Sequence, residues 1–202
     1  AYLATEADPA PETLLQHWPY YTSKLEAERV TLELAPHYGL HLVCINPSLL
    51  LGPGDKEGSS TQDVKLILEK KVPAIPSGGL NFVDVRDVAN GAILAFQKGR
   101  AGERYLMGGA NWLLKEFISQ VGKLAEVKVP SLKAPDAPTR WAAYFFFHTL
   151  GKVSPLDPVS IEMSQVFWYF SSEKAKKELS FFSRPPEETL RDMIEYLQQV
   201  KK

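Results

Sequence analysis

The chain has 202 residues, with 23 Lys and Arg, 24 Asp and Glu, and a formal net charge of −1 at pH 7. This balance gives no electrostatic reason to expect a nucleic-acid partner or an anionic membrane surface. The most apolar stretch, residues 141–150, is far shorter than the ~20 residues of a membrane-spanning helix, so no membrane span is expected. The one cysteine, Cys44, forms no internal disulfide, which fits a reducing compartment and predicts a cytoplasmic protein.

The first part of the chain predicts a helix followed by a buried strand. Residues 1–18 are rich in proline and predict a loop. A helix is expected from Tyr20 to Tyr38, where Gly39 ends it. The short apolar run over residues 41–46 predicts a buried strand. Helix, glycine turn and buried strand form the second half of a βαβ unit, which indicates an α/β fold with a parallel sheet.

The rest of the chain predicts a mixture of strands and helices. Strands are expected over residues 81–83, 104–107 and 127–129, and helices over 61–70, 85–97, 111–124, 140–150, 159–170, 172–179 and 186–200. Asn111 is expected to cap the helix that it begins. On the 85–97 helix, the positions expected to face inward are Val88, Ala92, Ile93 and Phe96.

Tyr20 and Lys24 lie four residues apart at the start of the first long helix. Residues at i and i+4 share a helix face, so the phenol and the ammonium can point at one spot. A free phenol has a pKa of ~10, and a neighbouring cation favours its charged form, which makes a tyrosine a usable proton donor or acceptor. The alternative is a solvated lysine that pairs with Glu28, again four residues further on.

Several ordered motifs resemble the middle of an extended short-chain dehydrogenase/reductase. The branch contains NAD(P)-dependent sugar epimerases, including hopanoid-associated ones, and dihydroflavonol-reductase-like and farnesol-dehydrogenase-like enzymes. The matching positions are residues 19–55, with Tyr20, Lys24, Asn46-Pro47 and Gly52-Pro53-Gly54, followed by residues 81–89 and 102–106. The resemblance covers most of residues 13–125 and, more loosely, the tail to residue 200.

The resemblance implies a fold and a reaction. Residues 1–50 would be the remnant of a Rossmann-like NAD(P)-binding domain with a doubly wound parallel sheet. Residues 51–202 would be mainly a smaller, mostly helical substrate domain, with some segments returning to that sheet. The reaction would be hydride transfer at an alcohol or carbonyl, by an oxidoreductase or epimerase that uses NAD or NADP. Tyr20 would exchange a proton with the substrate, and Lys24 would hold the nicotinamide ribose hydroxyls and favour the phenolate.

Further cofactor contacts follow from the same resemblance. The backbone of Pro47, Ser48 and Leu49 would line the nicotinamide at the carboxyl edge of the sheet, where ligands bind in open α/β folds. The alternative is a plain turn after a strand. Ser59 or Ser60 would reach the cofactor phosphates, although a polar loop before a helix explains both residues almost as well.

The chain contains no glycine-rich turn of the kind that begins dinucleotide binding. Gly52-Pro53-Gly54 follows a strand, but Gly58 comes one residue too late for Gly-x-Gly-x-x-Gly, and Pro53 has no N–H to offer a phosphate. The family's catalytic serine or threonine would fall at or just before Ala1. We therefore expect the C-terminal half of an enzyme, inactive on its own. NAD and NADP stay open, because the residue that selects between them follows an earlier strand.

The substrate prediction rests on the aromatic last third of the chain. The residues are Trp141, Tyr144, Phe145, Phe146, Phe147, Phe167, Trp168, Tyr169 and Phe170. They indicate either packing between two short helices or an apolar channel or lid, and the second fits an apolar alcohol or ketone better than a sugar derivative. The four histidines share no metal-ligand spacing, so no metal site is predicted.

Two aspartates lie in the motif over residues 81–89. Asp84 stands where many relatives carry histidine, and Asp87 is expected to be structural, in the first turn of its helix. The Tyr20–Tyr38 helix is, by resemblance, a candidate homodimer interface. The rival to an enzyme is a non-catalytic dehydrogenase-like scaffold or assembly subunit. An upstream glycine-rich turn and catalytic hydroxyl would favour the enzyme, and the absence of both would favour the scaffold.

Overall fold

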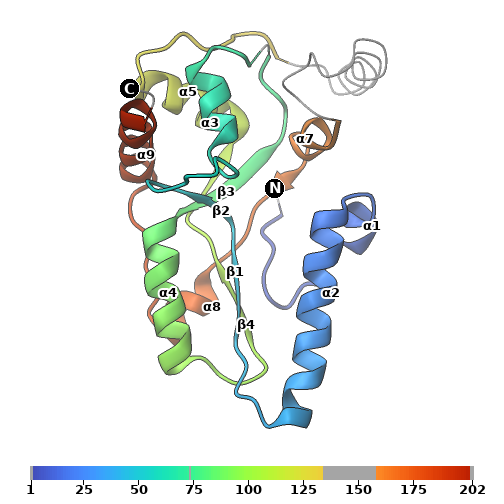
Figure 1. Cartoon of the computed structure of the whole chain (residues 1–202). Coiled ribbons are helices and arrows are strands. Elements are labelled where there is room, and N and C mark those ends of the chain that lie inside the picture. Colours follow the sequence, from blue (N-terminus) through green and yellow to red (C-terminus); the bar gives the residue numbers. More distant parts are fainter. Residues whose placement is uncertain (1, 73, 134–157, 201–202) are drawn as a thin grey trace.

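The computed structural model describes residues 2–72, 74–133 and 158–200, whose strands form two sheets (Figure 1). The first sheet pairs β1 (Cys44–Pro47) with β4 (Arg104–Met107) in parallel. The second sheet contains β2 (Leu49–Leu51), β3 (Gly79–Asp84), β5 (Ala110–Leu113) and β6 (Phe167–Trp168). Strand β3 pairs with the other three, parallel to β2 and β6 and antiparallel to β5.

Helices cover both sides of the first sheet. Figure 1 shows α2 (Pro19–Leu34) on one side of β1 and β4, and α4 (Val85–Lys98) on the other, with α8 (Glu173–Leu179) near α4. A parallel sheet with helices on both faces is the Rossmann-like, doubly wound arrangement. The predicted α/β fold class is therefore confirmed.

The local sequence explains where α2 begins and ends. Pro19 occupies the first turn, where its missing N–H is not needed. After α2 the chain continues as a short 3-10 helix over Ala35–Tyr38, because Pro36 lacks the N–H that another α-helical turn would use. Gly39, with φ 64°, ends the helix in the left-handed conformation that glycine adopts easily. The predicted helix is confirmed, with a tighter last turn.

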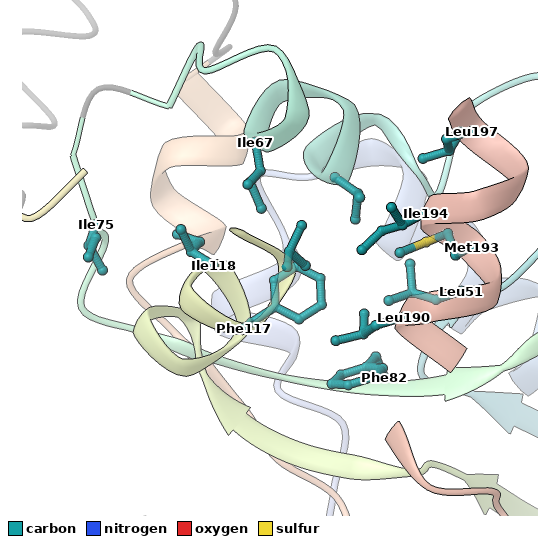
Figure 2. Packing of buried hydrophobic residues seen from close by; sticks show 12 residues of the cluster. Leu51, Ile67, Ile75, Phe82, Phe117, Ile118, Leu190, Met193, Ile194 and Leu197 are labelled. Atoms are coloured by element: carbon teal, nitrogen blue, oxygen red, sulfur yellow. The ribbon is translucent and has the colours of Figure 1, made fainter. Parts of the chain in front are cut away.

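The larger hydrophobic core packs the second sheet against α3 (Gln62–Leu68), α5 (Leu114–Leu124) and α9 (Pro186–Val200). Figure 2 shows Leu51 of β2 and Phe82 of β3 near Phe117 of α5 and Leu190 and Met193 of α9. The Phe82 and Phe117 rings meet edge to face, with centroids 5.4 Å apart. Each such buried side chain stabilises the fold by about 1.5–3 kcal/mol. This core does not depend on α2, which contains no buried residue.

A smaller cluster joins the first sheet to α4 and α8. Its buried members are Val83, Val88, Ala95, Tyr105, Met107, Ala175, Leu179 and Phe181. The cluster overturns part of the prediction for α4. Val88 is buried, but Ile93 and Phe96 are 57% and 91% exposed, and the inward side carries Asp87 and Gly91 instead. An aspartate faces inward here because an arginine from the C-terminal segment binds it.

Three further predictions are wrong, two of them because a distant partner decides the structure. Asn111 does not cap a helix: it lies in β5, where its side chain accepts a hydrogen bond from Asn81, 2.8 Å away. Residues 127–129 form no strand. In place of one helix over residues 159–170, α7 (Pro158–Met163) is followed by β6, which pairs with β3.

The strand expected over residues 41–46 is found over Cys44–Pro47, and none of its residues is fully buried, whereas most other elements match their predictions. Helices are found near residues 61–70, 172–179 and 186–200, and strands near residues 81–83 and 104–107. The predicted N-terminal loop contains one short helix, α1 (Glu12–Leu15). The helix predicted over residues 140–150 lies outside the described residues. Within the described ranges, no helix combines the length and the hydropathy of a membrane-spanning segment.

The two strands of the first sheet differ at their outer edges. On β4, the backbone groups that point away from β1 are hydrogen-bonded to side chains from other segments. Glu6 accepts a hydrogen bond from the Leu106 N–H at 2.7 Å, and Lys174 donates to the Arg104 carbonyl at 2.7 Å. Among the described strands, β1 has no neighbour besides β4. The outer edge of β1, at Ile45, therefore pairs with no described strand.

Candidate active site

Tyr20 and Lys24 occupy the first turns of α2, as predicted. The Lys24 Nζ lies 5.6 Å from the centroid of the Tyr20 ring, so the i, i+4 spacing does bring the two side chains together. Tyr20 is 65% exposed and therefore accessible to a ligand. In Figure 1, α2 runs antiparallel to β1, so its first turns lie toward the carboxyl end of that strand. This is the edge at which open α/β sheets bind ligands.

Glu28 does not behave as the pairing alternative for Lys24 requires. One of its carboxylate oxygens accepts a hydrogen bond from Asn46 Nδ2 at 2.5 Å, and the other lies 3.4 Å from Arg104 Nη1. Both oxygens are therefore engaged by the sheet, and the Glu28 side chain is only 17% exposed. Lys24 is left directed at Tyr20.

The carboxyl end of β1 leads straight into the second sheet. Pro47 is the last residue of β1, the Ser48 N–H donates to the Met107 carbonyl at 3.1 Å, and Leu49 begins β2. The predicted turn is therefore a passage between two sheets. Asn46 lies on β1, and Ser48 follows the last residue of that strand. Asn46 Oδ1 and Ser48 Oγ are both buried without a hydrogen-bond partner in the described part of the chain. Buried polar atoms normally have partners, so these two atoms suit a ligand or further chain.

The loop that carries Ser60 is organised around Asp55. The Asp55 carboxylate accepts hydrogen bonds from the N–H groups of Gly58, Ser60 and Thr61 and from the Thr61 hydroxyl, at 2.8–3.0 Å. Burial alone would raise the pKa of the Asp55 carboxyl, but these hydrogen bonds lower it. The backbone N–H of Ser60 is thus committed to the loop, and only its hydroxyl remains for the predicted phosphate contact.

An aromatic cluster surrounds the start of α2. The Trp168 ring of β6 stacks on Tyr21 at 6.3 Å with an interplanar angle of 8°, and lies 5.8 Å from the Trp18 ring. The Tyr20 ring meets Tyr21 edge to face at 5.3 Å. Burial raises the pKa of the Tyr21 phenol, and the nearby Tyr20 and Asp63, the latter on α3, raise it further. The C-terminal segment therefore contacts the first turn of α2, whereas α3 acts on Tyr21 through the charge of Asp63.

Only some of the aromatic residues on which the substrate prediction rests lie within the described residues. Trp168 contacts the candidate site, whereas Phe167 is 46% exposed, and Tyr169 packs over Gly79. Phe170 is half-buried and forms an isolated parallel bridge with Ala4, and Trp141 and Tyr144 to Phe147 lie outside the described residues.

The two aspartates of the motif over residues 81–89 bind arginines. Asp84 accepts a hydrogen bond from the Arg86 N–H at 2.9 Å, which caps α4, and two more from the Arg86 guanidinium. Asp87 binds the guanidinium and the backbone N–H of Arg184. These contacts join β3 and α4 to the C-terminal segment, so they support a structural role for both aspartates.

Sequence reasoning did not identify Trp18 as a site neighbour, and it named Glu28, Asn46 and Trp168 only in other roles: a partner of Lys24, a motif position and one of several aromatic residues. Glu28 had one usable signal, since Tyr20, Lys24 and Glu28 recur every four residues on one helix face. The signal for Trp168 was only its aromatic surroundings in the sequence, because its position beside α2 depends on the pairing of β6 with β3. A search of the described residues finds no group of His, Cys, Asp and Glu that could hold a metal ion.

Comparison with known proteins shows the family of the chain. A family model described as "NAD dependent epimerase/dehydratase family" matches residues 4–108, just over half of the chain. The chain is 29% identical over 187 residues to a protein named "Putative dihydroflavonol 4-reductase" from Synechocystis sp., with 89% of this chain and 54% of that protein covered. The chain thus spans about half the length of this curated relative.

Solved structures support the same conclusion. The crystal structure of gox2253 is 31% identical, with a TM-score of 0.80 over 99% of this chain and 62% of that one. The structure of RMD from Pseudomonas aeruginosa complexed with NADPH shares the fold at 17% identity, with a TM-score of 0.63 over 90% of this chain and 57% of that one. The protein belongs to the NAD-dependent epimerase/dehydratase family of extended short-chain dehydrogenases, and the cofactor of this family is NAD(P).

Proposed function

We propose that these residues form the catalytic half of an NAD(P)-dependent oxidoreductase or epimerase, in which Tyr20 is the acid/base. The observation that carries the proposal is the Lys24 ammonium over the exposed Tyr20 ring, toward the carboxyl end of β1. The Tyr20 phenol can exchange a proton with a substrate hydroxyl or carbonyl oxygen that reaches this face. Lys24 supplies positive charge beside the phenol and can donate hydrogen bonds to a ribose.

The residues at the strand ends fit the cofactor of the family. Pro47, Ser48 and Leu49 would hold the nicotinamide, and the unpartnered Asn46 Oδ1 and Ser48 Oγ fit a bound group that offers hydrogen-bond donors, such as a carboxamide. The Ser60 hydroxyl would serve the phosphates. The bound cofactor supplies the hydride or accepts it. The division into residues 1–50 and 51–202 belongs to the same proposal, because the chain leaves the first sheet at Ser48.

The substrate is proposed to be an apolar or aromatic alcohol or ketone, with a sugar derivative as the competing class. Tyr21 and Trp168 place half-buried aromatic rings beside Tyr20, which favours a flat, apolar substrate. The name of the Synechocystis relative, a dihydroflavonol reductase, agrees with this class. A complete enzyme that turns over nucleotide sugars and ignores aromatic and terpenoid alcohols would contradict it.

Replacement of Tyr20 tests the proposed function. In the complete protein, Tyr20→Phe removes the proton-transferring oxygen while keeping the ring, so turnover should fall by about 10²-fold or more with cofactor affinity nearly unchanged. Steady-state kinetics and nicotinamide fluorescence measure the two effects. The control is Tyr38→Phe, which removes a phenol oxygen at the exposed far end of the helical segment. Full turnover by Tyr20→Phe would favour the rival, a non-catalytic scaffold or assembly subunit.

A further inference from the structure

Among the described residues, α2 is joined to the first sheet by the hydrogen bonds of one side chain, Glu28. This helix carries Tyr20 and Lys24, yet none of its residues is buried. Most of its described side-chain hydrogen bonds stay within the helix or its own N-terminal flank, as do those of Thr22, Arg29 and Thr31. Glu28 is different, because its carboxylate reaches across to both strands of the first sheet.

The contacts of Glu28 extend well beyond one ion pair. Arg104, which lies 3.4 Å from the Glu28 carboxylate, also donates to the backbone carbonyls of Glu6 and Asp8 at 2.8 and 2.9 Å. Glu28 therefore connects α2 with β1, β4 and the segment that leads into α2. Cys44, on β1, is close enough for the Glu28 charge to add to the effect of burial in raising the thiol pKa.

The chemistry of Glu28 also fixes the orientation of Asn46. A carboxylate only accepts hydrogen bonds, so Asn46 must turn its NH₂ group toward Glu28. The Asn46 oxygen then faces away, next to the strand end at Ser48. The Glu28 side chain thus bonds α2 to β1 at Asn46, and it also determines which way the Asn46 amide faces at the end of β1.

We propose that Glu28 is a positioning residue, whose carboxylate fixes where Tyr20 and Lys24 stand relative to the carboxyl end of β1. This inference rests on the proposed function, since it concerns the placement of the same acid/base. Glu28 lies eight residues after Tyr20, about 12 Å along the helix axis, so it touches no reacting group itself. A small tilt of α2 at Glu28 displaces Tyr20, and displacements of about 1 Å can cost up to 10²-fold in rate.

The test uses the complete protein with Glu28→Ala, Glu28→Asp and Glu28→Gln. Gln keeps an acceptor for Asn46 at the same reach and gives up only the longer 3.4 Å contact with Arg104, whereas Asp shortens the side chain and Ala removes it. We expect kcat to fall about tenfold or more for Ala and Asp and to stay within threefold for Gln, with the dissociation constant of NAD(P)H changed less than kcat. The pH profile of kcat should shift for Ala and Asp, because the surroundings of Tyr20 change. The control is Glu33→Ala, an exposed residue of α2 whose partner is Arg29.

The outcomes separate this inference from a purely structural role and from the proposed function. If Glu28→Ala does not fold, Glu28→Asp carries the test. A lower Tm with wild-type kcat per folded molecule and an unchanged pH profile would overturn the positioning role. If Tyr20→Phe abolishes turnover while Glu28→Asp behaves as wild type, only the positioning role fails. If Tyr20→Phe remains fully active, the proposed function itself fails.

Discussion

At the scale of single residues, Asp84 combines helix capping, ion pairing and burial. Its side chain is fully buried, bonds the Arg86 guanidinium at 2.7 Å and lies 3.4 Å from the Arg184 guanidinium. Burial alone would raise the pKa of Asp84, but the Arg86 hydrogen bonds and the two positive charges lower it. A carboxyl whose pKa is lower in the folded state stabilises the fold above its unfolded pKa of ~4, and this stabilisation is lost as the pH falls through the folded value.

Asp84→Asn should therefore be destabilising near neutral pH and less so in acid. Asn removes the buried negative charge, but Asp192 still pairs with Arg86 and Asp87 still pairs with Arg184, so the loss is about 1–3 kcal/mol. Urea unfolding at pH 7 and at pH 3 measures the difference. We expect a large loss at pH 7 and a smaller one at pH 3, where the wild-type carboxyl is closer to neutral. An equal loss at both pH values would contradict the ionised role of Asp84.

At the scale of elements, Gly91 is the residue of α4 that packs against β4 and against the segment after α8. A Cβ added to Gly91 would lie 2.7 Å from Met107 Sδ and 3.0 Å from the Phe181 ring, and both of these residues are buried. The helix thus approaches the sheet more closely than any larger residue at this position permits. This close approach explains why a residue of low helix propensity occupies the interior of α4.

Gly91→Ala should therefore destabilise the protein, although alanine is the better helix former. Overpacking of this kind costs about 1–3 kcal/mol, more than the ~1 kcal/mol gained from helix propensity. Thermal and urea unfolding give the net effect. The neighbouring exposed residue supplies the control, because Asn90→Ala adds no contact and should leave stability unchanged or slightly higher. A Gly91→Ala protein more stable than wild type would show that the core has room to adjust.

The elements also show which parts of the fold the sequence predicts. The α2 helix has local signals at both ends, Pro19 and Gly39, and was predicted correctly. The inward face of α4 was mistaken because hydrophobicity is a poor guide when Asp87 finds an arginine inside. Strands β2 and β5 were missed, since each is short and becomes a strand only by pairing with β3.

At the scale of the whole molecule, the sequence predicts those features of the candidate site that local structure creates, and it misses those that depend on distant segments. Tyr20 and Lys24 were found from spacing, because the helix itself brings them together. Trp168 was predicted only as part of an aromatic region, because its contact with Tyr21 depends on how a distant segment folds back. The roles of Tyr20, Lys24, Pro47, Ser48, Leu49 and Ser60 in catalysis and cofactor binding remain predictions.

The whole-molecule prediction concerns cofactor binding by these 202 residues alone. The chain contains no glycine-rich turn to hold a pyrophosphate, so addition of NADH or NADPH should leave nicotinamide fluorescence unchanged, whereas the complete protein should bind. Fluorescence titration of both proteins, with the complete protein as the positive control, makes the comparison. Tight binding by the 202 residues would contradict the proposal that cofactor binding needs a glycine-rich turn outside them.

The two edges of the first sheet differ in whether a further strand could pair with them. On β4, Glu6 and Lys174 already occupy the outward N–H of Leu106 and the outward carbonyl of Arg104, so a strand added there would have to displace two charged side chains. On β1 no described strand stands in the way. Any additional strand therefore joins beside Ile45, and the short strand that now forms a border becomes an interior one. Tyr20 and Lys24 then stand over the middle of a wider sheet and not over its rim.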